Sequence, residues 1–94
     1  GLFAYIDRSL GYGQWMDLDM YLQSVMLLCE EHGLATCAQG YWTFFHETVR
    51  EATGAPDTFM LACGLAVGFE DQSAPINGLH SARVAVDDFA VFVD

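Results

Sequence analysis

Two segments of the chain combine residue types and spacing suited to holding a ligand. The first is 34–42, an extended run that opens directly into a helix. The backbone N–H groups of Gly40 and Tyr41 are then the unpaired donors of a helix start, which suit an anion or an electron-rich heteroatom. Gly40 also lets a flat ligand approach the backbone closely. The alternative is that the segment is a strand-to-helix turn that binds no ligand. For this segment taken alone, that alternative is the better interpretation.

The second segment is 77–83, within a stretch (70–83) that its polar residues, Pro75 and Gly78 predict to be a loop. It ends at Arg83, one of only three cationic side chains in the chain. The planar guanidinium of arginine matches the oxygens of a phosphate group. The alternative is a surface salt bridge to one of the 13 acidic residues, which is the better interpretation of this segment by itself.

The other polar residues predict neither a catalytic side chain nor a metal site. The sequence has no nucleophile elbow, no phosphate-binding P-loop and no zinc-protease motif. Its histidines are far apart and share no ligand-like spacing with a carboxylate or a cysteine: His32, His46 and His80. We interpret His32 as a favourable residue at the C-terminal end of a helix and His46 as a surface residue.

Composition excludes several classes of protein. The 94 residues fit one small domain, and 53% of them are hydrophobic, which excludes a disordered chain. With a net charge of −10 and only three Lys or Arg residues, the chain has no cluster of cations that could bind a nucleic acid or an anionic membrane surface. The longest apolar run, 59–69, is shorter than the ~18 residues that a membrane-spanning helix needs. The apolar excess indicates contact with another chain.

Cysteine usage favours a reducing, cytoplasmic location. Cys29, Cys37 and Cys63 are odd in number and form no CxxC pair, so neither a disulfide framework nor a zinc site is predicted. No basic segment followed by an apolar core indicates a signal peptide. Because the chain begins at Gly1, we expect it to be a processed or excised piece.

These segments must be positioned by a mixed α+β unit. The spacing predicts a long helix over 15–32, ended by Gly33, with Asp17 and Asp19 in its first turn. Apolar residues occur on most sides of this helix, so we expect a second chain or a further segment to cover part of it. Trp42, Phe45 and Val49 predict a second helix over 41–53, ended by Gly54.

The apolar run 58–69 predicts a strand buried on both faces. Gly64 and Gly68 share one face of this strand, so a neighbouring element, most simply a helix, is expected close to its backbone. Residues 1–14 are interpreted as loop-like because of their glycines. Residues 86–89 predict one turn of helix, followed by a short C-terminal strand over 90–93.

Taken together and in order, these segments resemble the C-terminal half of a nitroreductase-family flavoprotein. The resemblance covers nearly all of the chain and is carried by four segments: Gln14–Leu28, Gly33–Gln39, Met60–Phe69, and Ala74–Asn77 leading to Arg83. It implies a single partial domain over 1–94, FMN as cofactor, NAD(P)H as electron donor, a nitroaromatic or quinone-like acceptor, and an intertwined homodimer in which helix 15–32 is central.

The resemblance also implies the site. The backbone at Gly40 and Tyr41, with Ala38 and Gln39 before it, is expected to face N5 of the flavin. Arg83 is expected to contact the FMN phosphate, and His80 falls where relatives carry a second cation. Because the N-terminal half that completes the family's site is missing, two alternatives stay open. One is a truncated, non-catalytic association module without flavin, and the other is an FMN pocket shared between copies of the chain.

Overall fold

A long apolar strand at the centre of a three-stranded antiparallel sheet organises the fold. The computed structural model describes residues 1–93, and its sheet has the order β1-β3-β2. The elements in chain order are β1 Leu2–Asp7, α1 Gly13–Glu31, β2 Ala35–Gln39, the 3-10 helix η1 Gly40–Phe45, α2 His46–Thr53, β3 Phe59–Gly68, the 3-10 helix η2 Pro75–Gly78 and α3 Val86–Phe89. The predicted α+β class is confirmed.

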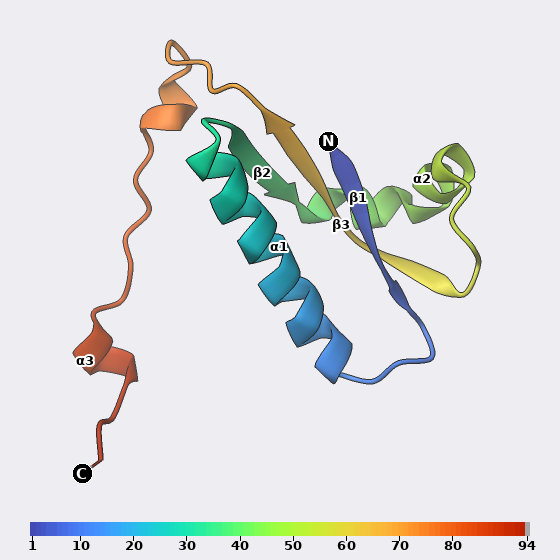
Figure 1. Cartoon of the computed structure of the whole chain (residues 1–94), viewed down its shortest axis with the longest axis horizontal. Coiled ribbons are helices and arrows are strands. Elements are labelled where there is room, and N and C mark those ends of the chain that lie inside the picture. Colours follow the sequence, from blue (N-terminus) through green and yellow to red (C-terminus); the bar gives the residue numbers. More distant parts are fainter. Residues whose placement is uncertain (94) are drawn as a thin grey trace.

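Pairing along β3 fixes the register of both neighbours. Ala38 and Gln39 of β2 lie opposite Leu65 and Gly64, and Phe3 of β1 lies opposite Gly64 on the other side. The helix α1 runs along one face of the sheet, whereas η1 lies at the end of β2 (Figure 1). The buried apolar side chains come from both sheet and helices: Ala4, Ile6, Leu22, Val49, Leu61 and Leu65.

The two predicted helices are present with shifted boundaries. The first begins at Gly13, so Asp17 and Asp19 lie beyond the first turn and the predicted acidic first turn is wrong. Its end is as expected, because Gly33 has a φ of 72° and the N–H of Leu34 donates to the carbonyl of Cys29 at 2.8 Å. The predicted helix 41–53 divides into η1 and α2, and Gly54 ends it with a φ of 69°.

Two expectations for the ends of the chain are wrong. Residues 2–7 form β1 rather than a loop, because Ala4 and Ile6 alternate into the core while the backbone pairs with β3. The predicted strand over 90–93 is absent. A strand exists only with a partner, and the C-terminal segment extends away from the sheet (Figure 1).

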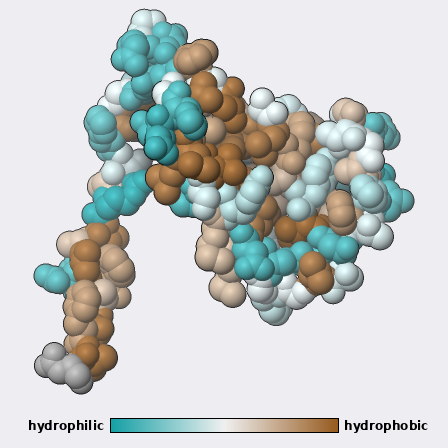
Figure 2. Space-filling model, viewed as in Figure 1, coloured by the Kyte–Doolittle hydropathy of each residue, from teal (hydrophilic) through white to brown (hydrophobic). Residues whose placement is uncertain are grey.

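Much of the apolar surface stays exposed. On α1 the side facing away from the sheet carries exposed Met16, Met20 and Leu27, the last 61% exposed. The C-terminal segment exposes Phe89 and Phe92, and it forms a hydrophobic arm beside the body of the molecule (Figure 2). None of the helices among residues 1–93 has both the length and the apolar character needed to cross a bilayer.

Candidate functional site

The corner where β2 ends and η1 begins is the best-defined candidate site. Gln39 is the last residue of β2, and Gly40 starts η1. The hydroxyl of Thr43 donates to the carbonyl of Gly40 at 2.8 Å, which fastens the first turn. A Cβ placed on Gly40 would meet nothing within 4 Å, so the space beside this backbone is open. The first N–H groups of a helix have no acceptor within it and are available to a ligand.

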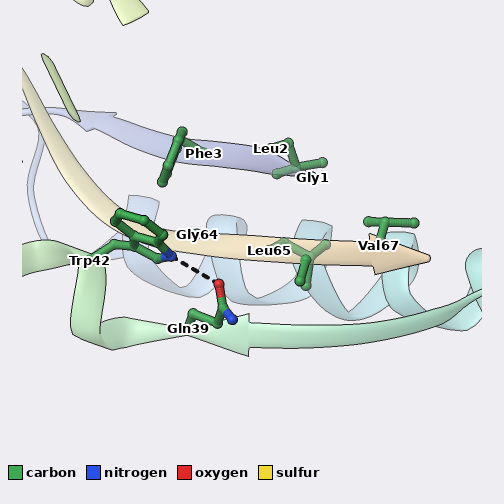
Figure 3. A pocket seen from close by; sticks show the side chains of 9 residues that line it. Gly1, Leu2, Phe3, Gln39, Trp42, Gly64, Leu65 and Val67 are labelled. Carbon is green, nitrogen blue, oxygen red and sulfur yellow. Dashed lines mark hydrogen bonds between the residues drawn. The ribbon is translucent and has the colours of Figure 1, made fainter. Parts of the chain in front are cut away.

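A cavity of about 350 Å³ lies next to this corner, on the face of the sheet opposite α1 (Figure 3). Its lining is mostly apolar and comes from the N-terminal residue, all three strands and η1: Gly1, Leu2, Phe3, Gln39, Trp42, Gly64, Leu65, Ala66 and Val67. The indole of Trp42 lies over Gly64, and its Nε1 donates to Oε1 of Gln39 at 2.9 Å. The corner therefore has polar backbone groups beside an apolar hollow.

The expected close approach to β3 is confirmed at one glycine and wrong at the other. A Cβ on Gly64 would lie 2.5 Å from Cδ1 of Trp42, so only glycine fits beneath the ring. A Cβ on Gly68 would meet nothing within 4 Å. The element that approaches is η1, because its Trp42 points back onto the sheet, and it reaches only the part of β3 that lies opposite the end of β2.

The second candidate segment is organised by the loop before it. The carboxylate of Asp71 accepts hydrogen bonds from the hydroxyl and the N–H of Ser73, at 2.7 and 2.9 Å, and these bonds lower the pKa of Asp71. The side-chain amide of Asn77 donates to the carbonyl of Asp71 at 2.9 Å. Asn77 also lines a cavity of about 290 Å³ with Ala35, where β2 begins.

The structure does not bring the two segments together within one copy of the chain. Asn77 lies near the start of β2, whereas Gly40 follows its end. His80 and Arg83 continue away from η2 on the exposed C-terminal segment. The guanidinium of Arg83 donates to the carbonyls of Ser81 and Ala82, at 3.3 and 3.1 Å. Among residues 1–93 these two bonds use only one of its nitrogens, which leaves the other nitrogens for a ligand.

The titratable groups near the sheet do not resemble a catalytic set. Partial burial of Cys63 on β3, with a smaller contribution from the charge of Asp19 on α1, raises the pKa of its thiol. All three cysteines are free thiols. Among residues 1–93, no three side chains of the metal-ligating types gather. The corner provides backbone N–H donors and open space for a ligand, and in the part of the chain that the structure describes it has no set of side chains for acid–base chemistry.

Comparison with known proteins decides the family. The model of the nitroreductase family matches residues 7–69, which include α1, β2, η1, α2 and β3. The chain belongs to the nitroreductase family. The resemblance inferred from the four sequence segments is thereby confirmed.

Individual relatives of this nitroreductase-family chain agree over nearly its whole length. The chloronitrobenzene nitroreductase of Comamonas testosteroni is 33% identical over 99% of the chain. The FMN- and NADPH-dependent nitroreductase NfnB of a Sphigopyxis strain superposes with a TM-score of 0.93 at 42% identity, covering 98% of the chain and 41% of that protein. The FMN-dependent NfnB of Mycobacterium smegmatis, solved with NADPH, gives 0.93 at 26% identity and covers the same shares.

The chain spans about 41% of the length of the curated nitroreductases that it matches. This share agrees with the prediction that the chain matches only part of the length of a nitroreductase-family protein.

Sequence reasoning missed the contact between Gln39 and Trp42. It placed Trp42 at the end of the candidate segment 34–42 and on the apolar stripe of a helix, but gave its indole no hydrogen-bond partner, although the Gln-x-x-Trp spacing across a glycine was visible. Phe3 was missed as well, because the first residues were interpreted as a loop. Its ring meets Trp42 edge to face, with ring centres 5.3 Å apart.

Proposed function

We propose that this chain is the C-terminal half of an FMN-dependent oxidoreductase of the nitroreductase type. The observation that carries the proposal is the β2–η1 corner of a nitroreductase-family fold, where backbone donors adjoin open space at Gly40. Two solved relatives are described as FMN-dependent, and one of them is in complex with NADPH. When bound, FMN would accept a hydride from NAD(P)H and pass electrons to a nitroaromatic or quinone-like acceptor.

The residues at the corner fit the flavin ring system. The backbone N–H groups of Gly40 and Tyr41 would donate toward N5, while Ala38 and Gln39 form the strand end that leads to them. A planar ligand can approach because Gly40 has no side chain and no neighbour within 4 Å of the Cβ position. The chain's own contribution is to bind, orient and polarise the cofactor, and no side chain acts as an acid or base.

The phosphate of FMN is assigned to Arg83, with His80 as a second polar contact. A charge-assisted contact from a guanidinium is one of the stronger hydrogen bonds available to a phosphate. Because Arg83 lies on the C-terminal segment, away from the corner, we propose a homodimer in which each pocket takes residues from two copies. The exposed apolar side of α1 supplies the surface for that dimer.

A second candidate is a non-catalytic association module that keeps the dimer helix without flavin. It is favoured by the low number of cations near any phosphate position in a chain of net charge −10. In both cases the three free cysteines support a reducing, cytoplasmic compartment.

One measurement separates the two candidates. The protein that carries this chain, at its natural length, is purified and titrated with FMN while its absorbance and its mass in solution are recorded. We expect a yellow dimer whose flavin is reduced by NADH or NADPH, with affinity for FMN rising with protein concentration if copies share the pocket. A dimer that stays colourless in excess FMN would instead establish the association module.

A further inference from the structure

One aromatic ring connects all three strands to the start of η1. Trp42 stands over Gly64 of β3, meets Phe3 of β1 edge to face, and donates through its indole N–H to Gln39 of β2 (Figure 3). The two rings lie at 86° with centres 5.3 Å apart, a favourable arrangement for an aromatic pair. The side chain of Trp42 therefore links the first turn of η1 to all three strands.

The hydrogen bond between Gln39 and Trp42 closes a loop around the two residues assigned to flavin N5. Gln39 and Trp42 are three positions apart, so only Gly40 and Tyr41 lie between the ends of the bond. Neither residue is held to the sheet by a buried side chain of its own, since Gly40 has none, and Tyr41 is 71% exposed with its ring beside two others of the same 3-10 helix, those of Phe44 and Phe45. Their backbone orientation depends on their neighbours.

We propose that Gln39 and Trp42 are positioning residues, whose hydrogen bond and packing on Gly64 hold the Gly40 and Tyr41 N–H groups in the direction that flavin N5 requires. The inference rests on the proposed function. It assigns Gln39 a role through its side chain, in addition to its place in the strand that leads to the site.

The N–H groups of Gly40 and Tyr41 need a fixed orientation before the reaction begins. A donor stabilises developing charge only if it already points at the reacting atom, because reorientation during the reaction has a free-energy cost. A glycine at the corner admits the flavin but restricts its own backbone less than any other residue, and the Thr43 hydroxyl holds only the Gly40 carbonyl. The pair Gln39 and Trp42 restricts that freedom from both sides without placing a side chain in the open space.

Four variants test the proposal in the protein at its natural length. Gln39→Met removes the acceptor at similar side-chain length, and Trp42→Phe removes the indole N–H while keeping an aromatic ring over Gly64. Gln39→Glu retains an oxygen acceptor and is the rescue variant. Gln72→Met, in the exposed loop after β3, is the matched control, because Gln72 lies outside the β2–η1 corner and its side-chain amide donates to the carboxylate of Glu70.

The first measurement needs no flavin. Backbone ¹⁵N NMR order parameters of Gly40 and Tyr41 are measured without FMN in the unmodified protein and in each variant. A rigid backbone gives values of about 0.85, and a flexible backbone gives values below about 0.6. We expect both values to fall in Gln39→Met and Trp42→Phe and to stay at the unmodified level in Gln39→Glu and Gln72→Met. Unchanged order parameters in the first two variants would overturn the proposal.

The second measurement uses bound FMN. We expect Gln39→Met to lower the rate of flavin reduction at saturating NADPH by about three- to tenfold, the effect of one hydrogen bond, with KM little changed and the visible absorption of the flavin shifted. Because both residues act through one hydrogen bond, the double variant Gln39→Met with Trp42→Phe should reduce the flavin about as slowly as Trp42→Phe alone. A double variant whose losses simply multiply would contradict a shared role.

The outcomes separate this inference from the proposed function. If the unmodified protein binds no FMN, the proposed function fails, whatever the order parameters show. If it binds FMN but Gln39→Met has the spectrum, rate and order parameters of Gln72→Met, the positioning role alone fails.

Discussion

At the scale of single residues, Arg83 has the most direct expected effect. Replacing Arg83 by alanine removes the guanidinium assigned to the FMN phosphate, so we expect FMN binding to weaken by about 1–3 kcal/mol, or about 5- to 150-fold in Kd. Flavin fluorescence titration measures this change. Arg50→Ala is the control, since Arg50 pairs with Asp57 at 2.6 Å on the exposed surface, where an ion pair contributes little. Equal affinity in Arg83→Ala and the unmodified protein would remove Arg83 from the site.

A second residue-scale prediction concerns Asp7, at the end of β1. Its carboxylate accepts hydrogen bonds from the N–H and the hydroxyl of Ser9, at 2.8 and 2.7 Å, which lower its pKa in the folded protein. The folded state then binds fewer protons than the unfolded state at acidic pH, so the stabilisation is present above the ordinary pKa of about 3.9 and is lost as pH falls through the lower folded value.

The variant Asp7→Asn tests this linkage. We expect the difference in free energy of unfolding between the unmodified protein and the variant to be largest near neutral pH and to shrink below about pH 4, because Asp7 then becomes neutral too. Denaturant unfolding at pH 7 and pH 3 measures it. A difference that is the same at both pH values would show that the charge of Asp7 has no part in stability.

At the scale of elements, the helix ends depend on two glycines in the left-handed region. Gly54 has a φ of 69° and donates its N–H to the carbonyl of Arg50 at 2.8 Å, so Gly54→Ala should destabilise the fold by about 1–2 kcal/mol. Gly13→Ala is the matched control. It lies at the start of α1 without a positive φ, so alanine there should be neutral or stabilising. Similar losses in both variants would contradict the role of backbone conformation.

The elements that the sequence predicted correctly have strong local signals. The helix 15–32 has a periodic stripe and a glycine stop, and the strand over 58–69 is long and continuously apolar. The errors concern pairing. Residues 2–7 carry strand-forming side chains but were assigned to a loop, whereas 90–93 carry similar residues and have no partner strand. Local composition gives a propensity, and only the three-dimensional arrangement supplies the partner.

In the candidate site too, the local feature was predicted from the sequence and the long-range contact was not. The open corner at Gly40 was predicted from a glycine at a strand-to-helix junction, which is a local feature. The position of Trp42 over Gly64 was only half predicted, as an unnamed element close to β3. Its contacts join residues that are 22 and 39 positions apart in the chain, and no short-range pattern contains that information.

At the scale of the whole molecule, the exposed side of α1 argues for a second copy of the chain. Met20 and Leu27 are each more than 60% exposed, although burying such a side chain contributes about 1.5–3 kcal/mol. If they lie in the dimer interface, the double variant Met20→Glu with Leu27→Glu adds two carboxylates to a chain of net charge −10 at that interface. We expect dimer dissociation to increase at least 100-fold while the monomer stays folded, since neither side chain contributes to the described core.

Sedimentation velocity over a range of protein concentrations, with circular dichroism for folding, measures this effect. Gln72→Glu, on the exposed loop after β3, is the control for added charge and should leave the dimer intact. FMN affinity should fall together with dimerisation if each pocket takes Arg83 from a second copy, because ligand binding and assembly are then thermodynamically linked. A double variant that remains dimeric would show that the exposed side of α1 is not the interface, and a monomer that binds FMN as tightly as the dimer would show that the pocket is completed within one chain.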